Sequence, residues 1–190
     1  MKMNIVGIDP SLRNFGIVNA ILDTDTLEFE VTSMKLVESE DNAKKAKTVR
    51  KNSDDLRRAR LLHEGFQLAC QGASFAFVEV PVGSQSARAM ASYGICIGVL
   101  ASCPISMIQV TPTEVKLAMT GEKTATKDEM IEAAVKAHPG AKWLTRKSKG
   151  ELTLLAANEH LADACGAIMA GIKTDEFKAA LSMLKTLKAA

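Results

Sequence analysis

The segment MNIVGIDP at residues 3–10 decides how the rest of the chain is interpreted. Its apolar, largely β-branched run from Met3 to Ile8 predicts a strand. The strand must end at Asp9, because Pro10 has no amide hydrogen to donate to a neighbouring strand. Both faces of the run are apolar, as is typical of a strand in the middle of a covered sheet. We therefore expect Asp9 at the carboxyl end of a central strand.

The segments that follow predict a mixed sheet. Apolar runs at 15–22 and 27–37 come after short turns and indicate an antiparallel meander with the first strand. Expected strands at 74–80 and 105–110 are separated by helices, so they must cross over and pair in parallel. The expected fold is α/β: one five-stranded mixed sheet, with the first three strands antiparallel, the later two parallel, and helices on both faces.

Helix signals complete the expected element order. Ser53, Ser84 and Thr126 are candidate starts, and Glu129 completes a capping-box pattern with Thr126. The helix from Ser84 is expected to reach about residue 102, and the one from Thr126 to end near 138–140. A loop or mobile segment is expected at 42–52. A further helix is expected at about 151–171, followed by an amphipathic tail at 175–187.

Composition places the chain among soluble globular proteins. It has 190 residues, 47% of them hydrophobic and 24% charged, and a net charge of +2. No apolar run is long enough to span a bilayer, and residues 1–9 have no signal-peptide pattern. The four cysteines lack metal-binding spacing and are expected as buried thiols in a reducing cytosol. We therefore expect a cytoplasmic protein with no membrane partner.

Two blocks of positive charge stand out despite the small net charge. Residues 42–60 carry eight basic residues against two acids, and residues 142–149 carry four basic residues and no acid. Such blocks can form an electrostatic footprint for phosphates, or they can be an ordinary solvated surface. The charge pattern alone leaves both interpretations open. The basic residues of the first block are Lys44, Lys45, Lys47, Arg50, Lys51, Arg57, Arg58 and Arg60.

Acidic residues fall where expected strands end. Glu79 lies near the end of the 74–80 strand, as Asp9 does in the first strand. If these strands are parallel neighbours, both carboxylates reach the same sheet edge, where ligands bind in open α/β folds. Burying a carboxylate charge among apolar residues costs free energy unless a partner compensates it, and two neighbouring carboxylates also repel each other. A metal cation is therefore their natural partner.

The last long helix adds Glu159, His160 and Asp163. His160 and Asp163 are three residues apart and share a helix face. Taken singly, each acid is consistent with a turn or surface residue. Their joint placement in one topology favours a metal site.

The chain resembles RuvC-type Holliday junction resolvases of the RNase H-like superfamily. The resemblance rests on residues 7–11 and 14–16, on Val78-Glu79 before a small-residue helix, and on Asp163-Ala164. Residues 111–116, Gly121 and Thr126-Lys127 match the segment after the fifth strand. The resemblance covers residues 3–172, and the chain looks like a divergent, phage-type member. It implies a single RNase H-like nuclease domain over 1–190, with a C-terminal helical extension from about 173.

The resemblance also implies residue roles. It makes Asp9, Glu79 and Asp163 metal ligands, and it puts His160 in the fourth position, with Glu159 as the alternative. These four positions are also the expected catalytic residues. The remaining matched positions would contact DNA phosphates: Lys116, Lys127, Ser84, Gln85 and Arg88.

The implied activity is a Mg²⁺-dependent endonuclease, with Mn²⁺ able to substitute. Two ions about 4 Å apart, bridged by Asp9, would cleave four-way junctions or related branched DNA and leave a 5′ phosphate. A homodimer would make paired nicks. The helix that carries Ala87, Met90, Ala91, Ile95 and Leu100 either supplies the dimer face or packs in the core.

Two other functions stay open from the sequence. One is a non-catalytic protein that binds branched DNA. The other is an actin-like ATPase or sugar-kinase-related domain, which needs a second lobe and a second phosphate loop. The chain has neither the length nor a Gly-Thr/Ser pair after Asp9, so no nucleotide cofactor is expected.

Overall fold

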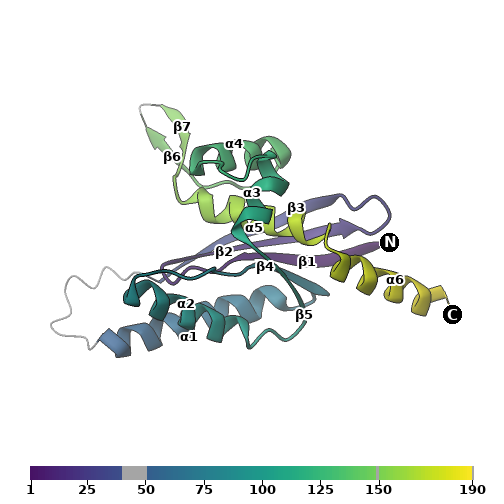
Figure 1. Ribbon diagram of the computed structural model, residues 1–190. Coiled ribbons are helices and arrows are strands. Elements are labelled where there is room, and N and C mark those ends of the chain that lie inside the picture. Colours follow the sequence, from purple (N-terminus) through teal and green to yellow (C-terminus); the bar gives the residue numbers. More distant parts are fainter. Residues whose placement is uncertain (40–50, 149, 190) are drawn as a thin grey trace.

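A five-stranded sheet forms the centre of the protein. The computed structural model describes residues 1–39, 51–148 and 150–189 (Figure 1). The strand order is β3-β2-β1-β4-β5. β1 pairs antiparallel with β2, and β2 with β3, whereas β1–β4 and β4–β5 are parallel. The predicted mixed sheet with a central first strand is confirmed. The strands are β1 Lys2–Asp9, β2 Asn14–Asp23, β3 Phe29–Glu38, β4 Phe75–Glu79 and β5 Ser106–Val110.

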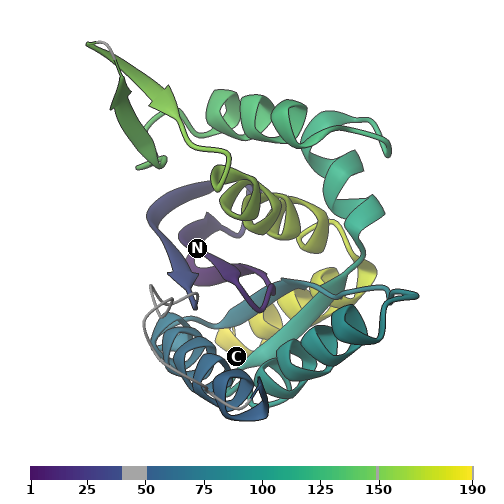
Figure 2. The ribbon, with the colours of Figure 1, turned by 90° about the vertical axis from the view of Figure 1, so that its left-hand side faces the viewer.

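Helices cover both faces of this sheet (Figures 1 and 2). One apolar cluster joins Val6 and Ile8 of β1 to residues of α1 and α2. The other joins Ile5 and the opposite face of the sheet to α3, α4, α5 and α6. The helices are α1 Lys51–Cys70, α2 Ala87–Leu100, α3 Pro112–Thr120, α4 Lys127–Ala137, α5 Asn158–Gly171 and α6 Asp175–Ala189.

Alternation along the strands sends both strand-end acids toward α5. Side chains two apart in a strand share a face. Ile5 faces the cluster that contains α5, so Asp9, four residues later, lies on that same side. Phe75 and Phe77 place Glu79 on this side of β4 in the same way. Because Ile8 pairs with Val78, Asp9 and Glu79 follow side by side at the strand ends.

Glycines let α5 lie directly on the sheet. A Cβ added to Gly7 would be 2.2 Å from the carbonyl oxygen of Ala164, and one on Gly16 would be 2.2 Å from the carbonyl oxygen of His160. Small buried residues on α5 complete the close approach. This contact holds the first turns of α5 against the end of β1 and the start of β2.

The expected helix from 151 is wrong at its start. Residues 145–154 form a hairpin, β6 Thr145–Ser148 and β7 Glu151–Leu154, and α5 begins only at Asn158. Gly150 supplies the positive φ of 90° near the hairpin turn. The buried Asn158 side chain accepts from the amide of Leu144 and donates to its carbonyl, both at 2.8 Å, and so fixes the base of the hairpin. The hairpin extends beyond α4 in both views (Figures 1 and 2) and carries Arg146 and Lys147 on an exposed surface.

Other expected boundaries differ from the structure. α1 includes residues 51–53, so Ser53 is not its cap and the expected loop cannot reach residue 52. The rest of that loop, 42–50, lies outside the described residues, as do Lys44, Lys45, Lys47 and Arg50. α2 is capped by Ser86 instead of Ser84. α3 was not expected as a helix, although Thr111 and Glu114 form a capping box before it.

The C-terminal segment beyond residue 173 is the helix α6, which packs on the core. Its buried Phe177 makes edge contacts with the rings of Phe75 and Phe77. Over the described ranges, no helix combines the length and apolar character that crossing a bilayer requires.

Candidate active site

A pocket opens where β1 and β4 end beneath the first turns of α5. It encloses about 370 Å³. Besides the ends of these two strands, four helices contribute to its lining. They are α5, α3, the start of α4 and, through Tyr93, α2. The titratable residues in the lining are Asp9, Glu79, Glu159, His160, Asp163, Lys116, Lys127 and Tyr93.

Asp9 is buried and hydrogen-bonded to His160. Only 9% of Asp9 is exposed, and its Oδ2 lies 2.6 Å from Nδ1 of His160. Burial raises the pKa of the Asp9 carboxyl, and the hydrogen bond with His160 offsets part of that rise. Burial alone would lower the pKa of His160, but the hydrogen bond and the charge of Asp9 outweigh it, so that pKa is raised. Both shifts favour keeping a proton within the Asp9–His160 pair.

The contacts continue from His160 to a lysine. Nε2 of His160 lies 3.4 Å from Oε1 of Glu159, and Oε2 of Glu159 lies 2.6 Å from Nζ of Lys127. The hydrogen bond with Glu159 raises the pKa of Lys127. Acid and base thus alternate from Asp9 through His160 and Glu159 to Lys127. This row neutralises part of the carboxylate charge from within the protein.

The carboxyl groups of Glu79 and Asp163 have strongly raised pKa values, because nearby positive charge does not compensate their burial. Burial, followed by the nearby charge of Asp9, raises the pKa of Glu79 to about 8 and that of Asp163 to about 7. The positive charge of Lys116 lowers both pKa values, but by less than burial raises them. Carboxyl groups in this state bind either protons or a cation at neutral pH.

The donor set suits a hard divalent cation. Four carboxylates and one imidazole line a single pocket, and oxygen-rich sets of this kind favour Mg²⁺ or Mn²⁺. Within the described ranges, however, no three His, Cys, Asp or Glu side chains are already arranged around one ion position. One Asp9 oxygen, Oδ2, is engaged by His160 in this structure.

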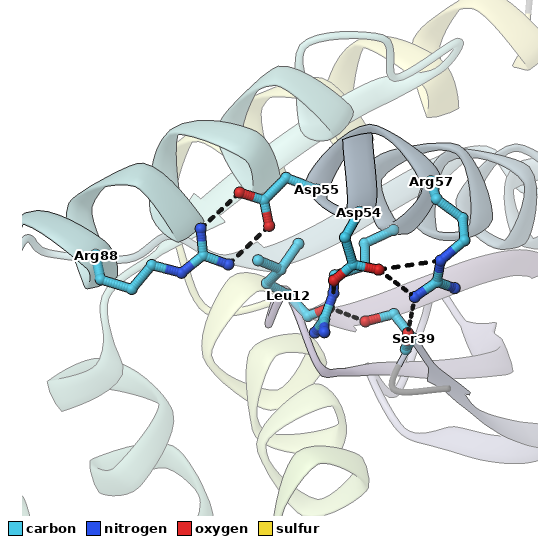
Figure 3. A network of polar contacts seen from close by, with 7 residues as sticks. Leu12, Ser39, Asp54, Asp55, Arg57 and Arg88 are labelled. Atoms are coloured by element: carbon cyan, nitrogen blue, oxygen red, sulfur yellow. Dashed lines mark hydrogen bonds and ion pairs between the residues drawn. The ribbon is translucent and has the colours of Figure 1, made fainter. Parts of the chain in front are cut away.

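The expected phosphate contacts divide into two groups. Lys116 and Lys127 line the pocket, on α3 and at the start of α4. Ser84 and Gln85 lie in the exposed loop before α2, outside the pocket lining. Arg88 is also outside this pocket and forms two hydrogen bonds with Asp55 (Figure 3).

Two contributions to the site were not expected from the sequence. Tyr93, the single tyrosine of the chain, reaches the pocket from α2. Glu159 was expected only as a competitor of His160, yet both line the pocket and Glu159 holds Lys127. The sequence signal for the contact between Glu159 and Lys127 is the capping box at Thr126. It starts α4 there and places Lys127 in the first turn.

Comparison with known proteins agrees with this fold. No family model matches the chain, and no curated protein matches it. Among solved structures, T. thermophilus RuvC in complex with a Holliday junction substrate matches with a TM-score of 0.64 at 18% identity, covering 95% of this chain and 96% of that one. A second T. thermophilus RuvC structure gives 0.60 at 19% identity, covering 95% and 97%.

The order and pairing of the strands, together with the match to RuvC, place the chain in the RNase H-like class of fold. Within that class, the chain has the fold of RuvC over nearly its whole length. The predicted resemblance to RuvC-type resolvases is thereby confirmed at the level of the fold.

Proposed function

We propose that this protein is a divalent-metal-dependent DNA endonuclease that cleaves four-way junctions or related branched DNA. The observation that carries the proposal is the pocket of four carboxylates where β1 and β4 end beneath α5. Support comes from the shared fold with T. thermophilus RuvC, a protein whose structure is in complex with a Holliday junction substrate.

The metal would be held by Asp9, Glu79 and Asp163, with His160 in the fourth position and Glu159 as the alternative. Bound Mg²⁺, as one ion or as the two that the resemblance implies, makes water a stronger nucleophile and stabilises the leaving oxygen. Support for His160 over Glu159 in the fourth position comes from its place against Asp9, whereas Glu159 is held by Lys127.

The protein's own residues balance part of the negative charge of the site. The hydrogen bond between His160 and Asp9 keeps a proton among the buried carboxylates, which limits their mutual repulsion. Lys116 and Lys127 lie at the pocket wall, where their charges can hold the phosphate of a DNA strand against the acids.

A homodimer would place two such sites on one junction. The exposed side of α2 offers a face of small and apolar residues, with Met90 and Ile97 each 47% exposed. Cβ atoms added to Gly94 or Gly98 would meet open space, so a second helix could approach closely. Of the residues expected there, Leu100 is buried and Ile95 packs against the core, so those two are not available. The proposed face is Ala87, Met90, Ala91, Gly94, Ile97 and Gly98.

The test is a panel of DNA substrates incubated with Mg²⁺: a four-way junction, a flap, a fork and linear duplex. The proposal predicts cleavage of branched DNA, loss of cleavage with EDTA, and recovery with Mn²⁺. Binding of the junction without cleavage under any metal would instead establish a non-catalytic junction-binding protein. Absence of both binding and cleavage on every branched substrate would refute the proposal.

A further inference from the structure

A second pocket adjoins the carboxylate pocket. It encloses about 400 Å³ and shares three wall residues with the first: Pro10, Ser11 and Tyr93. The two pockets are therefore neighbours separated by a short wall at the end of β1. The remaining lining residues of the second pocket are Leu12, Arg13, Arg58, Ser86, Arg88, Ala89 and Ser92.

The charge of this second pocket is opposite to that of the first. Three arginines line it, from the turn after β1, from α1 and from α2, and among the residues that the structure describes no acidic one is in its lining. Ser11 and Ser86 add hydroxyl groups that can donate hydrogen bonds, whereas the Ser92 hydroxyl donates to the carbonyl of Arg88. We call this the arginine pocket. A site built from guanidinium and hydroxyl donors fits an oxyanion such as a phosphodiester.

Two aspartates that are not in the lining hold two of these arginines. Asp55 accepts from Nη1 of Arg88 at 2.5 Å and from Nη2 at 2.7 Å (Figure 3). Asp54 accepts from Nε of Arg58 at 2.7 Å. A guanidinium has more N–H groups than these contacts use, so donors remain for a ligand. The aspartates thus fix the arginines without filling the pocket.

The pocket wall is tied together across the fold. The Asp55–Arg88 pair joins α1 to α2. Arg57, which also binds Asp54 at 2.7 Å, donates to the carbonyl of Ser39 after β3. The Ser39 hydroxyl in turn donates to the carbonyl of Leu12 beside the pocket (Figure 3). A guanidinium held in this way loses less conformational entropy when it binds phosphate.

The start of α2 adds a further attraction for anions. Ser86 caps this 14-residue helix and lines the pocket. Helix N-termini carry a partial positive charge and favour phosphate. The cap alone would not define a site, but here it meets three arginines in one concavity.

We propose that the arginine pocket binds a backbone phosphate of the same DNA strand whose scissile phosphate enters the carboxylate pocket. The inference rests on the proposed nuclease function and deepens it by assigning a second phosphate position. Repulsion from four carboxylates opposes DNA binding at the first pocket, and the adjacent arginines offset it. The arginine pocket contributes affinity for DNA and fixes the register of the DNA strand, whereas the bond is cleaved in the carboxylate pocket.

The test compares Arg58→Gln and Arg13→Gln with a matched control, Arg60→Gln. Arg60 is exposed on the same helix as Arg58 and lines neither pocket. Affinity for a fluorescent four-way DNA junction is measured across a range of NaCl concentrations, with Ca²⁺ replacing Mg²⁺. Removing one charge-assisted hydrogen bond to phosphate should weaken binding roughly 10-fold. The slope of log affinity against log salt should fall by about 0.7–0.9 for each phosphate that the variant no longer neutralises.

The outcomes separate this inference from the proposed function. Thermal unfolding identifies a variant that fails to fold, and Arg13→Gln, in an exposed turn, gives an independent reading if Arg58→Gln is destabilised. If the parent neither binds nor cuts branched DNA, the proposed function fails. If the parent binds and cuts, but both variants match Arg60→Gln in affinity and salt slope, the arginine pocket is not a phosphate site. A fall in kcat at saturating DNA, with unchanged affinity, also overturns the inference.

Discussion

Replacing Gly16 with alanine should damage the site more than the fold. The added Cβ would lie 2.2 Å from the carbonyl oxygen of His160 and 2.7 Å from its carbonyl carbon. Real Cβ atoms essentially never come closer than 3.0 Å, so the first turn of α5 must move by about 0.8 Å. That turn carries His160 and leads into Asp163, so both move away from Asp9 and Glu79.

The expected magnitudes follow from this shift. Overpacking of this kind costs about 1–3 kcal/mol of unfolding free energy. A misplacement of about 1 Å at a catalytic group can cost roughly 100-fold in rate. The assays are urea unfolding and single-turnover cleavage of a four-way junction in Mg²⁺.

Gly171→Ala is the matched control. Its Cβ would lie 2.1 Å from Cδ1 of Phe77, at the far end of α5 from the acids. It should lose a similar unfolding free energy but much less cleavage rate. Equal losses of rate in the two variants, or an unchanged rate in Gly16→Ala, would refute the argument that close packing of the first turn of α5 sets the site geometry.

Three further predictions concern the site and the dimer. Because the pKa values of Glu79 and Asp163 are raised to about 8 and about 7, their contribution to stability is present at low pH and is lost as pH rises through those values. Without metal, the melting temperature should therefore fall between about pH 4 and about pH 8, the range between the usual and the raised pKa values, and Mg²⁺ should restore it increasingly over the same range; a Mg²⁺ effect independent of pH would contradict this. His160→Ala should lower single-turnover cleavage at least roughly 10-fold while junction binding persists, and an unchanged rate and metal dependence would move the fourth position to Glu159. Gly94→Arg and Ile97→Glu should give monomers in sedimentation velocity and uncoupled single nicks on a junction, and a persistent dimer would exclude this face of α2.

The central strand shows how far sequence reasoning reaches. The apolar run before Asp9 and the missing donor of Pro10 determine where β1 ends. Crossover connections then require β4 to be parallel to β1, which puts Glu79 beside Asp9. These consequences depend on local pattern and chain topology alone, so they could be predicted.

The hairpin could not be predicted in the same way. Residues 151–157 include Glu, Leu and Ala, which are good helix formers, so their propensity predicts a helix that begins near residue 151. The strand state of residues 151–154 depends on the turn at Gly150 and on the hydrogen bonds between Asn158 and Leu144. The second of these is a tertiary contact that intrinsic propensity does not register.

The arginine pocket was hidden for a related reason. Sequence spacing showed a basic block that includes Arg57, Arg58 and Arg60, but not which of these residues turns toward α2. The structure separates Arg58, in the pocket, from the exposed Arg60. Partners such as Asp55 and Arg88, 33 residues apart, meet only when α1 and α2 pack.

The most direct test of the carboxylate pocket as a nuclease site is Asp9→Asn. The change removes the charge but keeps the shape of a side chain that is buried against His160. Asp175→Asn, on an exposed side chain of α6, is the control. We expect Asp9→Asn to bind a four-way junction as tightly as the parent and to lose Mg²⁺-dependent cleavage by at least roughly 100-fold. Cleavage by Asp9→Asn at the parent's rate would contradict the assignment.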